Sequence, residues 1–507
     1  MSGAPPSPSA RSSGVLLHPT ALPGPGPNGT FGAAAQAWIR LLGQSGVGVW
    51  QLLPLAPTDG TGSPYSSPSG SALNPALLDG ALLQQEGFIA ADPAQLRGEA
   101  LGPALLRCWP QQSEARKTEF RRWCRVERFW LRDHCRFMVL RNLQGGEPWW
   151  RWPAPLARRD RRALQRLHHD HHQALLQEAL VQWQLQRQWQ QLRGLAREQG
   201  VQLLGDLPFY VAHDSADGWS RPGLFSLGRG GSLEQQSGVP PDYFSATGQL
   251  WGTPVYRWPR HLLSGFRWWL QRLERQLELF DLLRLDHFRA LQAFWSVPGA
   301  DATAEHGVWK ASPGWPLLAL LWCRCALRGV LLGPAGRLGR LPLVAEDLGV
   351  ITPPVERLRD GFGLPGMKIL QFAFDGDPAN PYLPANIRGS RWVVYTGTHD
   401  NATTIGWWRS LNGEARARVE AAVGAPVTAP GWQLLELALA SSAELAVAPL
   451  QDLLELGDEA RFNTPGTTEG NWCWRLARPM ESLAGPLGGY GAMAARYGRG
   501  VAPAPTA

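Results

Sequence analysis

Short apolar runs recur along the chain, and each of them ends in a polar or a Gly/Pro-rich turn. The runs show no strict alternation of apolar and polar residues, which is typical of strands buried on both faces of a parallel sheet. Eight such strands predict an α/β protein with a (β/α)8 barrel, the TIM-barrel architecture. The eight runs are residues 15–17, 49–53, 201–204, 282–285, 343–345, 368–374, 392–395 and 445–449.

The longest gap between these runs predicts a helical insertion. Residues 84–200 are rich in Leu, Gln, Arg and Trp, and their apolar positions recur three and four residues apart, as in Leu164 and Leu167 or in Trp189 and Leu192. This period is typical of helices. We therefore expect a helical subdomain after the second strand.

The next gap has a different character. Residues 207–271 carry Gly, Pro, Ser and aromatic residues with little periodicity. Loops of this length in a compact protein tend to be functional, so we expect a loop-rich insertion after the third strand that forms a lid over the substrate. Both insertions belong to a single catalytic barrel of residues 14–496. The Pro-rich segments 1–13 and 497–507 are expected to be disordered tails.

The composition supports a folded protein and excludes a nucleic-acid partner. Of the 507 residues, 44% are hydrophobic and 18% are charged, which is enough apolar material for a large core. The net charge is +7, but only three of the 49 basic residues are lysines, and the arginines are scattered along the chain. Surfaces that bind nucleic acid cluster their basic residues.

The sequence also predicts a cytoplasmic protein. The N-terminus lacks the basic start and apolar stretch of a signal peptide, and the six cysteines form no C-x-x-C pair, so we expect reduced thiols. The longest apolar run, residues 316–323, is far shorter than the ~20 residues of a spanning helix and is followed by Arg324. We expect no membrane association, and a monomer or a weak homo-oligomer.

Four of the predicted strands are followed directly by acidic residues. These are Asp206 after the third run, Asp286 after the fourth, Glu346 after the fifth and Asp400 after the seventh. The active site of such a barrel lies at the carboxyl ends of its strands. One acid in this position is usually a helix cap or a structural hydrogen bonder, but four together predict a catalytic pocket.

The neighbours of these acids suggest how they ionise. Arg284 lies two residues before Asp286 on one strand, so both side chains face the same side and Arg284 can hold Asp286 charged. Glu346 has no basic residue within several positions along the chain, which is compatible with a raised pKa and an acid/base role. Acids that converge repel one another, and burial raises the pKa of at least one of them.

Further motifs accompany the four strand ends. They are Pro64-Tyr65-Ser66-Ser67 leading to Asn74-Pro75, the segment 238–249, Asn463-Thr464-Pro465-Gly466, and Asn471-Trp472. Taken together, they resemble the 4-alpha-glucanotransferases of glycoside hydrolase family 77, also called amylomaltases or disproportionating enzymes, in the α-amylase clan. The resemblance runs from about Gly14 to Trp474, and it is specific because so many motifs coincide.

The resemblance implies that the chain transfers α-1,4-glucan segments between maltooligosaccharides. Asp286 would be the nucleophile that forms a covalent glycosyl-aspartate, Glu346 the general acid/base, and Asp400 the third carboxylate, which fixes the hydroxyls of the distorted sugar. Retaining enzymes of this kind hold the first two carboxyl groups only ~5 to 5.5 Å apart. The chemistry needs no metal and no other cofactor.

Other side chains are expected to bind the glucan. The adjacent aromatics of the lid and those that flank it offer flat apolar faces for sugar rings, although each could instead be a packing residue of the core. The candidates for substrate binding are Ser63, Tyr65, Asp206, Tyr243, Phe244, Trp251, Trp258, Arg284, His287, His399 and Asn463.

Several other features have plainer interpretations. His168 and His172 have the i, i+4 spacing of zinc motifs, but no Glu lies between them, so we interpret residues 168–172 as a solvated helix surface. The glycines at 361–363 do not open a helix after a strand, as a nucleotide-binding loop would. Most of the 25 tryptophans, such as Trp183 and Trp189, are interpreted as packing residues.

Three alternatives to a transferase stay open. A hydrolase of the same clan would accumulate reducing ends from maltotriose, whereas transfer conserves their number. A non-catalytic glucan-binding protein would carry a damaged acid set, and all three acids are present in this chain. In a helical scaffold whose Trp-rich insertion binds partners, the acids would be incidental.

Overall fold

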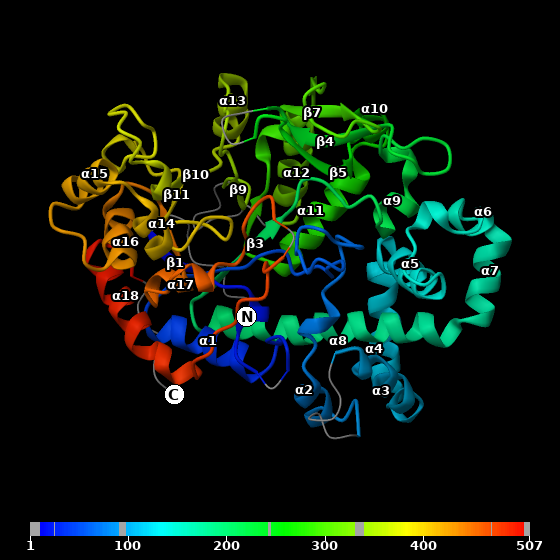
Figure 1. Cartoon of the computed structure of the whole chain (residues 1–507). Coiled ribbons are helices and arrows are strands. Elements are labelled where there is room, and N and C mark those ends of the chain that lie inside the picture. The colour runs from blue at the N-terminus through cyan, green and yellow to red at the C-terminus, as the bar shows by residue number, and fades with distance from the viewer. Residues whose placement is uncertain are drawn as a thin grey trace.

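The fold is a nearly closed barrel of eight parallel strands, and the computed structural model describes residues 11–24, 26–90, 98–241, 245–329, 339–467 and 469–500 (Figure 1). Neighbouring strands follow the order β10-β11-β12-β1-β2-β3-β6-β9. The two end strands meet where the Ala345 N–H donates to the Pro365 carbonyl at 2.8 Å. The strands are β1 (Ser12–Leu16), β2 (Val49–Gln51), β3 (Gln202–Leu207), β6 (Leu282–Leu285), β9 (Leu343–Ala345), β10 (Gly366–Ile369), β11 (Trp392–Tyr395) and β12 (Leu445–Pro449).

Each predicted apolar run overlaps one of these strands, so the predicted barrel is confirmed. Leu16, Val49 and Leu204 belong to a separate cluster that fills the barrel interior, whereas Val15 and Trp50 belong to the larger core outside it. Because successive side chains of a strand point to opposite faces, both faces must be apolar. This is why the runs lack alternation.

Helices cover the outside of the barrel, and Figure 1 shows α1 and α8 along one side of it. One crossover departs from the repeating pattern: residues 370–391, which the structure describes throughout, contain only two 3-10 turns between β10 and β11. The helices of the other crossovers and of the C-terminal part are α1 (Ala33–Gln44), α8 (His172–Glu198), α11 (Arg267–Leu279), α12 (Gly314–Leu327), α13 (Pro353–Gly361), α14 (Thr404–Ser410), α15 (Gly413–Val423), α16 (Pro430–Ala440), α17 (Leu450–Leu453) and α18 (Ala484–Arg496).

The helical insertion after β2 is confirmed and leads into α8. Trp183 and Trp189 of α8 are buried, as expected for packing residues. Gln182, also buried, donates to the Leu73 carbonyl at 2.8 Å and accepts from the Leu73 N–H at 2.9 Å, which fixes the loop after β2 to α8. The helices of the insertion are α2 (Gly80–Gln85), α3 (Leu101–Cys108), α4 (Glu114–Val126), α5 (Leu131–Leu143), α6 (Ala154–Ala157) and α7 (Arg161–Asp170).

The insertion after β3 is more regular than its sequence suggests. Besides α9 (Ala216–Ser220) and α10 (Trp258–Leu263), it contains β4 (Gln235–Val239) and β5 (Gln249–Pro254), which pair antiparallel. β4 also pairs with β7 (Ala293–Pro298), and β7 with β8 (Val308–Ala311). The expectation of an irregular loop is therefore wrong for β4 and β5, and the resulting sheet joins the insertion to the segment that follows β6.

The expected tail boundaries are wrong by a few residues at both ends. Ser12 and Ser13 belong to β1, and the Arg11 side chain donates to the Tyr497 carbonyl at 3.1 Å. The buried side chain of Arg499 donates to the Leu439 carbonyl at 2.7 Å. Residues 11–13 and 497–500 are thus part of the packed domain, while 1–10 and 501–507 lie outside the described residues.

Two findings bear on the expected compartment. Within the described ranges, the structure has no helix that combines the length and the apolar character needed to cross a bilayer. All six cysteines are free, and Cys323 and Cys473 are exposed.

Candidate active site

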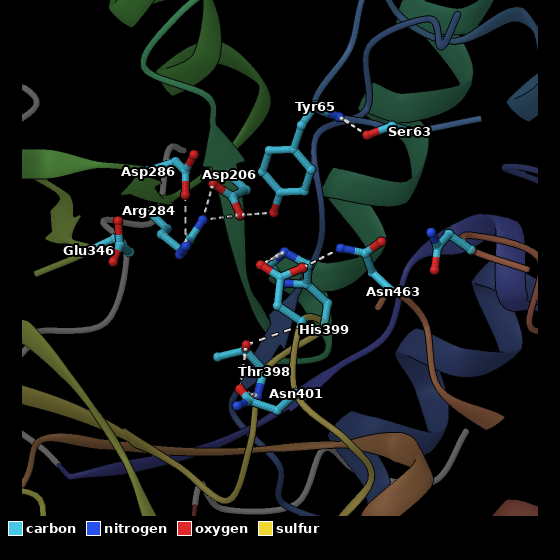
Figure 2. Close-up of polar contacts among 12 residues, drawn as sticks. Ser63, Tyr65, Asp206, Arg284, Asp286, Glu346, Thr398, His399, Asn401 and Asn463 are labelled. Carbon is cyan, nitrogen blue, oxygen red and sulfur yellow. Dashed lines mark hydrogen bonds and ion pairs between the residues drawn. The ribbon is translucent and has the colours of Figure 1, made fainter. Parts of the chain in front are cut away.

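A single arginine joins two of the strand-end acids (Figure 2). Nη1 of Arg284 lies 2.9 and 2.7 Å from the two Asp206 oxygens, and Nη2 lies 2.9 Å from Asp286 Oδ1. Arg284 points into the barrel because it alternates with Leu283 and Leu285, which face outward. Asp206 is buried, whereas the Asp286 side chain is 30% exposed. The expected Arg284–Asp286 contact is confirmed, and of the two acids Asp286 is the one accessible to solvent.

Glu346 is held by the residue that follows Asp286. The backbone N–H of His287 donates to Glu346 Oε2 at 2.7 Å, and the N–H of Leu348 donates to Oε1 at 3.0 Å. His287 has φ +52° and ψ +47°, a left-handed conformation that costs a residue with a Cβ atom about 1–2 kcal/mol. Such strain persists where the surrounding structure holds the residue in that conformation. Here it accompanies the hydrogen bond that joins the end of β6 to the end of β9.

Burial sets the ionisation of Glu346. It raises the pKa of this carboxyl group to about 7; Arg284 acts against the rise, the negative charge of Asp286 adds to it, and the two N–H donors oppose it. The raised pKa matches the sequence-based expectation, but its cause differs in part. No basic residue lies near Glu346 along the chain, but Arg284 is close enough in space to act on its pKa. Glu346 can therefore exchange a proton near neutral pH.

Asp400 is fixed by contacts from the segment after β12. Asn463 Nδ2 donates to Asp400 Oδ1 at 2.6 Å, and Arg461 Nη2 donates to the Asp400 carbonyl at 2.7 Å. His399 Nε2 lies 3.3 Å from Asp400 Oδ2. The Asp400 side chain is nevertheless 46% exposed, so it is oriented by these partners and still accessible to a ligand.

Tyr65 connects the acids to an aromatic wall. Its hydroxyl donates to Asp206 Oδ2 at 2.8 Å, and its ring stacks on His399 with a centroid distance of 5.2 Å and an interplanar angle of 12°. Trp472 lies 5.9 Å from the same ring. Burial and the nearby Asp206 raise the pKa of Tyr65, so the phenol stays protonated. Ser63 accepts from the Tyr65 N–H at 3.3 Å.

A second aromatic group lies beside the Asp286 strand end. The rings of Trp251 and His287 are 4.9 Å apart in an edge-to-face arrangement, and Tyr210 lies within 6.3 Å of His287. Trp251 is 38% exposed. Burial lowers the pKa of His287 to about 4, although Asp286 opposes the shift, so the imidazole is neutral at pH 7. The site thus combines three carboxyl groups, those of Asp286, Glu346 and Asp400, with hydrogen-bond donors and accessible aromatic rings. Such an arrangement is suited to binding and cleaving a sugar chain.

Comparison with known proteins identifies the family. The sequence model described as 4-alpha-glucanotransferase, of glycoside hydrolase family 77, matches residues 17–481. The chain belongs to this family. The 4-alpha-glucanotransferase of Thermus thermophilus is 43% identical over 486 residues, covering 92% of this chain and 95% of that protein, and that of Synechocystis sp. is 41% identical over 485 residues, covering 92% and 94%. The activity of the chain is accordingly that of a 4-alpha-glucanotransferase on alpha-glucans.

A solved structure of the family supports the fold. The amylomaltase from Streptococcus agalactiae, solved in complex with acarbose, matches with a TM-score of 0.88 at 32% identity and covers 97% of this chain and 100% of that one. The amylomaltase of Corynebacterium glutamicum shares the fold at 18% identity, with a TM-score of 0.76, covering 96% of this chain and 75% of that one.

Not every expected glucan contact of this glucanotransferase reaches the pocket. Trp258 is 7% exposed and packs against Tyr256 and Trp269, with ring centroids 5.2 and 6.1 Å away. This burial, in the core that supports α10 and α11, argues against the expected role of Trp258 in sugar binding and favours the alternative that it is a packing residue. Tyr243 and Phe244 lie outside the described residues, so their role stays a prediction.

Some residues of the pocket were missing from the predicted set. Trp472 contacts Tyr65 and His399, and Arg461 bonds the Asp400 backbone. Trp472 lies in a motif that carried the family resemblance, so a signal for it existed. Arg461 lies only two positions before Asn463, but its role depends on a fold that brings it back to the β11 end.

The histidine cluster is not a single helix face. α7 ends at Asp170, His171 lies between the helices, and α8 begins at His172, so the assumed i, i+4 spacing of His168 and His172 within one helix is wrong. Among the described residues, no group of three or more His, Cys, Asp or Glu side chains is arranged to hold a metal ion.

Proposed function

We propose that this 4-alpha-glucanotransferase transfers α-1,4-glucan segments between maltooligosaccharides by retaining double displacement. Asp286 attacks the anomeric carbon while Glu346 gives its proton to the departing glycosidic oxygen. The product of this step is a covalent ester between the donor glucan and Asp286. Glu346 then takes the proton of the 4-hydroxyl of an acceptor glucan, which attacks the ester, regenerates an α-1,4 bond and frees Asp286.

The observation that carries this proposal is the 2.7 Å hydrogen bond from the His287 N–H to Glu346. It couples the acid/base candidate to the residue next to the nucleophile candidate, which is compatible with the short carboxyl separation of retaining enzymes, ~5 to 5.5 Å. The pKa of Glu346, raised to about 7, supports a group that donates a proton in one step and accepts it in the next. Arg284 orients Asp286 for attack.

Asp400 and His399 are assigned to the reacting sugar. Asp400 accepts from the sugar hydroxyls and stabilises the distorted ring of the oxocarbenium-like transition state, and His399 and Arg284 supply hydrogen-bond donors to the sugar and to Asp286. The partial exposure of Asp400 and its fixation by Asn463 support this assignment.

Transfer requires that an acceptor sugar outcompete water for the covalent intermediate. Tyr65, Trp472 and Trp251 offer aromatic faces beside the acids, and sugar rings stack on such faces while water is displaced. Within the insertion of residues 207–271, we assign β5, which carries Trp251 beside His287, to the lid over this pocket. The amylomaltase from Streptococcus agalactiae was solved in complex with acarbose, which supports a maltooligosaccharide-like ligand for this enzyme.

The free state of all six cysteines, two of them exposed, supports a reducing compartment. We therefore assign the enzyme to the cytoplasm.

Maltotriose tests the proposal. The enzyme should convert it to glucose and longer oligomers while the number of reducing ends stays constant; a steady rise in reducing ends would establish hydrolysis instead. With α-maltotriosyl fluoride, whose leaving group needs no protonation, Glu346→Gln should accumulate a glycosylated protein detectable by mass spectrometry, with the sugar on Asp286. Asp286→Asn should form no adduct and show no transfer. Full transfer by Asp286→Asn would overturn the mechanism.

A further inference from the structure

The loop between β11 and α14 presents two side chains that the proposed mechanism uses. It runs from Thr396 to Thr404 and carries His399, labelled in Figure 2, and Asp400. Both terminal threonines of the loop are fully buried, whereas the Asp400 side chain is 46% exposed. Groups of a functional site keep their geometry only if the elements that support them are held in place, so the anchors of this loop matter.

One carboxylate bonds both ends of the loop. Asp452, in the short helix α17 after β12, accepts from Thr396 Oγ1 at 2.6 Å and from Thr404 Oγ1 at 2.7 Å, both through Oδ2. Its Oδ1 accepts from the Thr404 backbone N–H at 2.8 Å. The carboxylate therefore ties the point where the loop leaves β11 to the point where α14 begins.

This anchor is costly, which argues for a specific role. Asp452 is 2% exposed, and none of the ion pairs found among the described residues involves it. Burial raises its pKa, and the three hydrogen bonds oppose the rise. A buried charge without a cation destabilises a core that apolar residues would stabilise. Only a carboxylate, however, offers enough acceptor sites for all three donors, because an amide has a single acceptor oxygen.

The middle of the loop has separate anchors. Asp458 Oδ1 accepts from the Thr403 N–H at 3.0 Å, and Arg461 bonds the Asp400 carbonyl. These contacts fix single points, so they do not determine the span from residue 396 to residue 404.

We propose that Asp452 is a positioning residue of the transferase: by joining Thr396 to Thr404, it fixes the loop that places His399 and Asp400 against the reacting sugar. The inference rests on the proposed function, since it assigns a task to the two loop side chains. Asp452 itself does not touch the substrate. Its contribution is therefore to the placement of groups that act in the transition state.

The first test is Asp452→Asn, which keeps the shape and removes acceptor capacity. Misplacement of catalytic groups by about 1 Å costs about a hundredfold in rate, so we expect kcat with maltotriose to fall by about ten- to a hundredfold. KM should change by less than about threefold, because the contacts of the ground state are largely kept. Rates are divided by the concentration of active sites, which is measured from the amount of glycosyl adduct. A variant that is partly unfolded is therefore not mistaken for a slow one.

Double variants distinguish a positioning role of Asp452 from a role in core stability alone. In a His399→Gln background, Asp452→Asn should cost less than about threefold in kcat, because part of what it positions is already removed. Thr404→Val should reproduce a several-fold loss of kcat and Thr404→Ser should restore the rate, which keeps the test valid if Asp452→Asn fails to fold. Asp79→Asn is the matched control: Asp79 likewise accepts from a threonine hydroxyl, Thr30 at 2.6 Å, and from a backbone N–H, Leu82 at 3.0 Å.

The control should lower the melting temperature with kcat unchanged. The proposal is overturned if Asp452→Asn behaves like Asp79→Asn, if its effect is the same with and without His399, or if Thr404→Val retains the parent rate. A wrong proposed function would give a different result: the single variant Asp286→Asn would then transfer glucan as fast as the parent enzyme.

Discussion

His287 binds Glu346 through its backbone: the N–H of one and the carboxylate of the other are 2.7 Å apart. The contact exists because His287 adopts φ +52°, which turns the chain directly after Asp286. The nucleophile candidate and the acid/base candidate are therefore linked through one peptide unit, and the backbone conformation of His287 controls their separation.

The first prediction compares two variants that both lack the imidazole. Glycine adopts positive φ without penalty, whereas alanine at such a position is strained. We expect His287→Gly to exceed His287→Ala in free energy of unfolding by about 1 kcal/mol and to keep the higher kcat. Urea unfolding and maltotriose kinetics measure the two quantities. If alanine equals or surpasses glycine in both, the left-handed backbone has no bearing on the site.

The second prediction concerns pH. Glu346 must be protonated to act as the acid in the first step, and burial raises its pKa to about 7. Formation of the covalent intermediate should therefore decline as the pH rises through about 7. The decline should vanish in Glu346→Gln acting on the glycosyl fluoride, whose departure needs no acid. A pH profile of the parent that is flat from about pH 6 to 9 would contradict this role.

The same pKa shift has a consequence for stability. The folded-state pKa of Glu346 lies above its ordinary value of 4.5, so the folded protein binds this proton more tightly than the unfolded chain does. The stabilisation is present below about pH 4.5 and is lost as the pH rises through about 7. Glu346→Gln cannot ionise, and it should be more stable than the parent at pH 8 by up to about 3 kcal/mol. At pH 5 the difference should be small.

The barrel could be predicted from the sequence because its strands are buried on both faces, so the apolar runs carry the signal themselves. The antiparallel sheet could not. β8 is exposed at all four residues, although three of them are apolar, and β5 is exposed or half-buried along most of its length, so neither strand is a buried apolar run like those of the barrel. The sheet also depends on a pairing between distant segments, since β4 pairs with β7 as well as with the neighbouring β5.

The third prediction tests the arginine that joins two acids. Arg284 reaches Asp206 with one nitrogen and Asp286 with the other. A lysine presents a single ammonium group and cannot bond both with the same geometry. We expect Arg284→Lys to lose about a hundredfold or more in kcat/KM for maltotriose, as for removal of a strong charge-stabilising donor. Arg340→Lys, at a bidentate pair with Glu444, should retain full activity.

The fourth prediction separates the two contacts of Tyr65. Tyr65→Phe removes the hydrogen bond to Asp206 but keeps the ring on His399, and the loss of one such bond, about 1 to 1.5 kcal/mol, should lower kcat by about tenfold. Tyr65→Ala also removes the stacking face and should raise KM in addition. Equal kinetic constants for the two variants would show that the ring contributes nothing to sugar binding.

The acids of the site could be predicted because each lies at or shortly after the carboxyl end of a strand, and parallel strands end at one rim. Their partners could not all be predicted in this way. Arg284 and Asp206 are 78 positions apart, and Asp400 and Asn463 are 63 apart, so these bonds exist only once the barrel closes. The same holds for Glu346, because its cationic neighbour Arg284 is distant in sequence and approaches it only in the folded barrel.

The last prediction distinguishes the two tryptophans that sequence analysis treated alike. Trp251 is 38% exposed beside His287, whereas Trp258 is 7% exposed within an aromatic core. Trp251→Ala should raise KM for maltotriose several-fold, or reduce the ratio of transfer to hydrolysis, with little change in melting temperature, since a half-exposed ring contributes little to the core. Trp258→Ala should lower the free energy of unfolding by about 3 to 5 kcal/mol, as for other large core truncations, while KM of the folded enzyme stays near the parent value. A Trp258→Ala variant of unchanged stability and raised KM would restore the sugar-binding interpretation of Trp258 and contradict its assignment to the core.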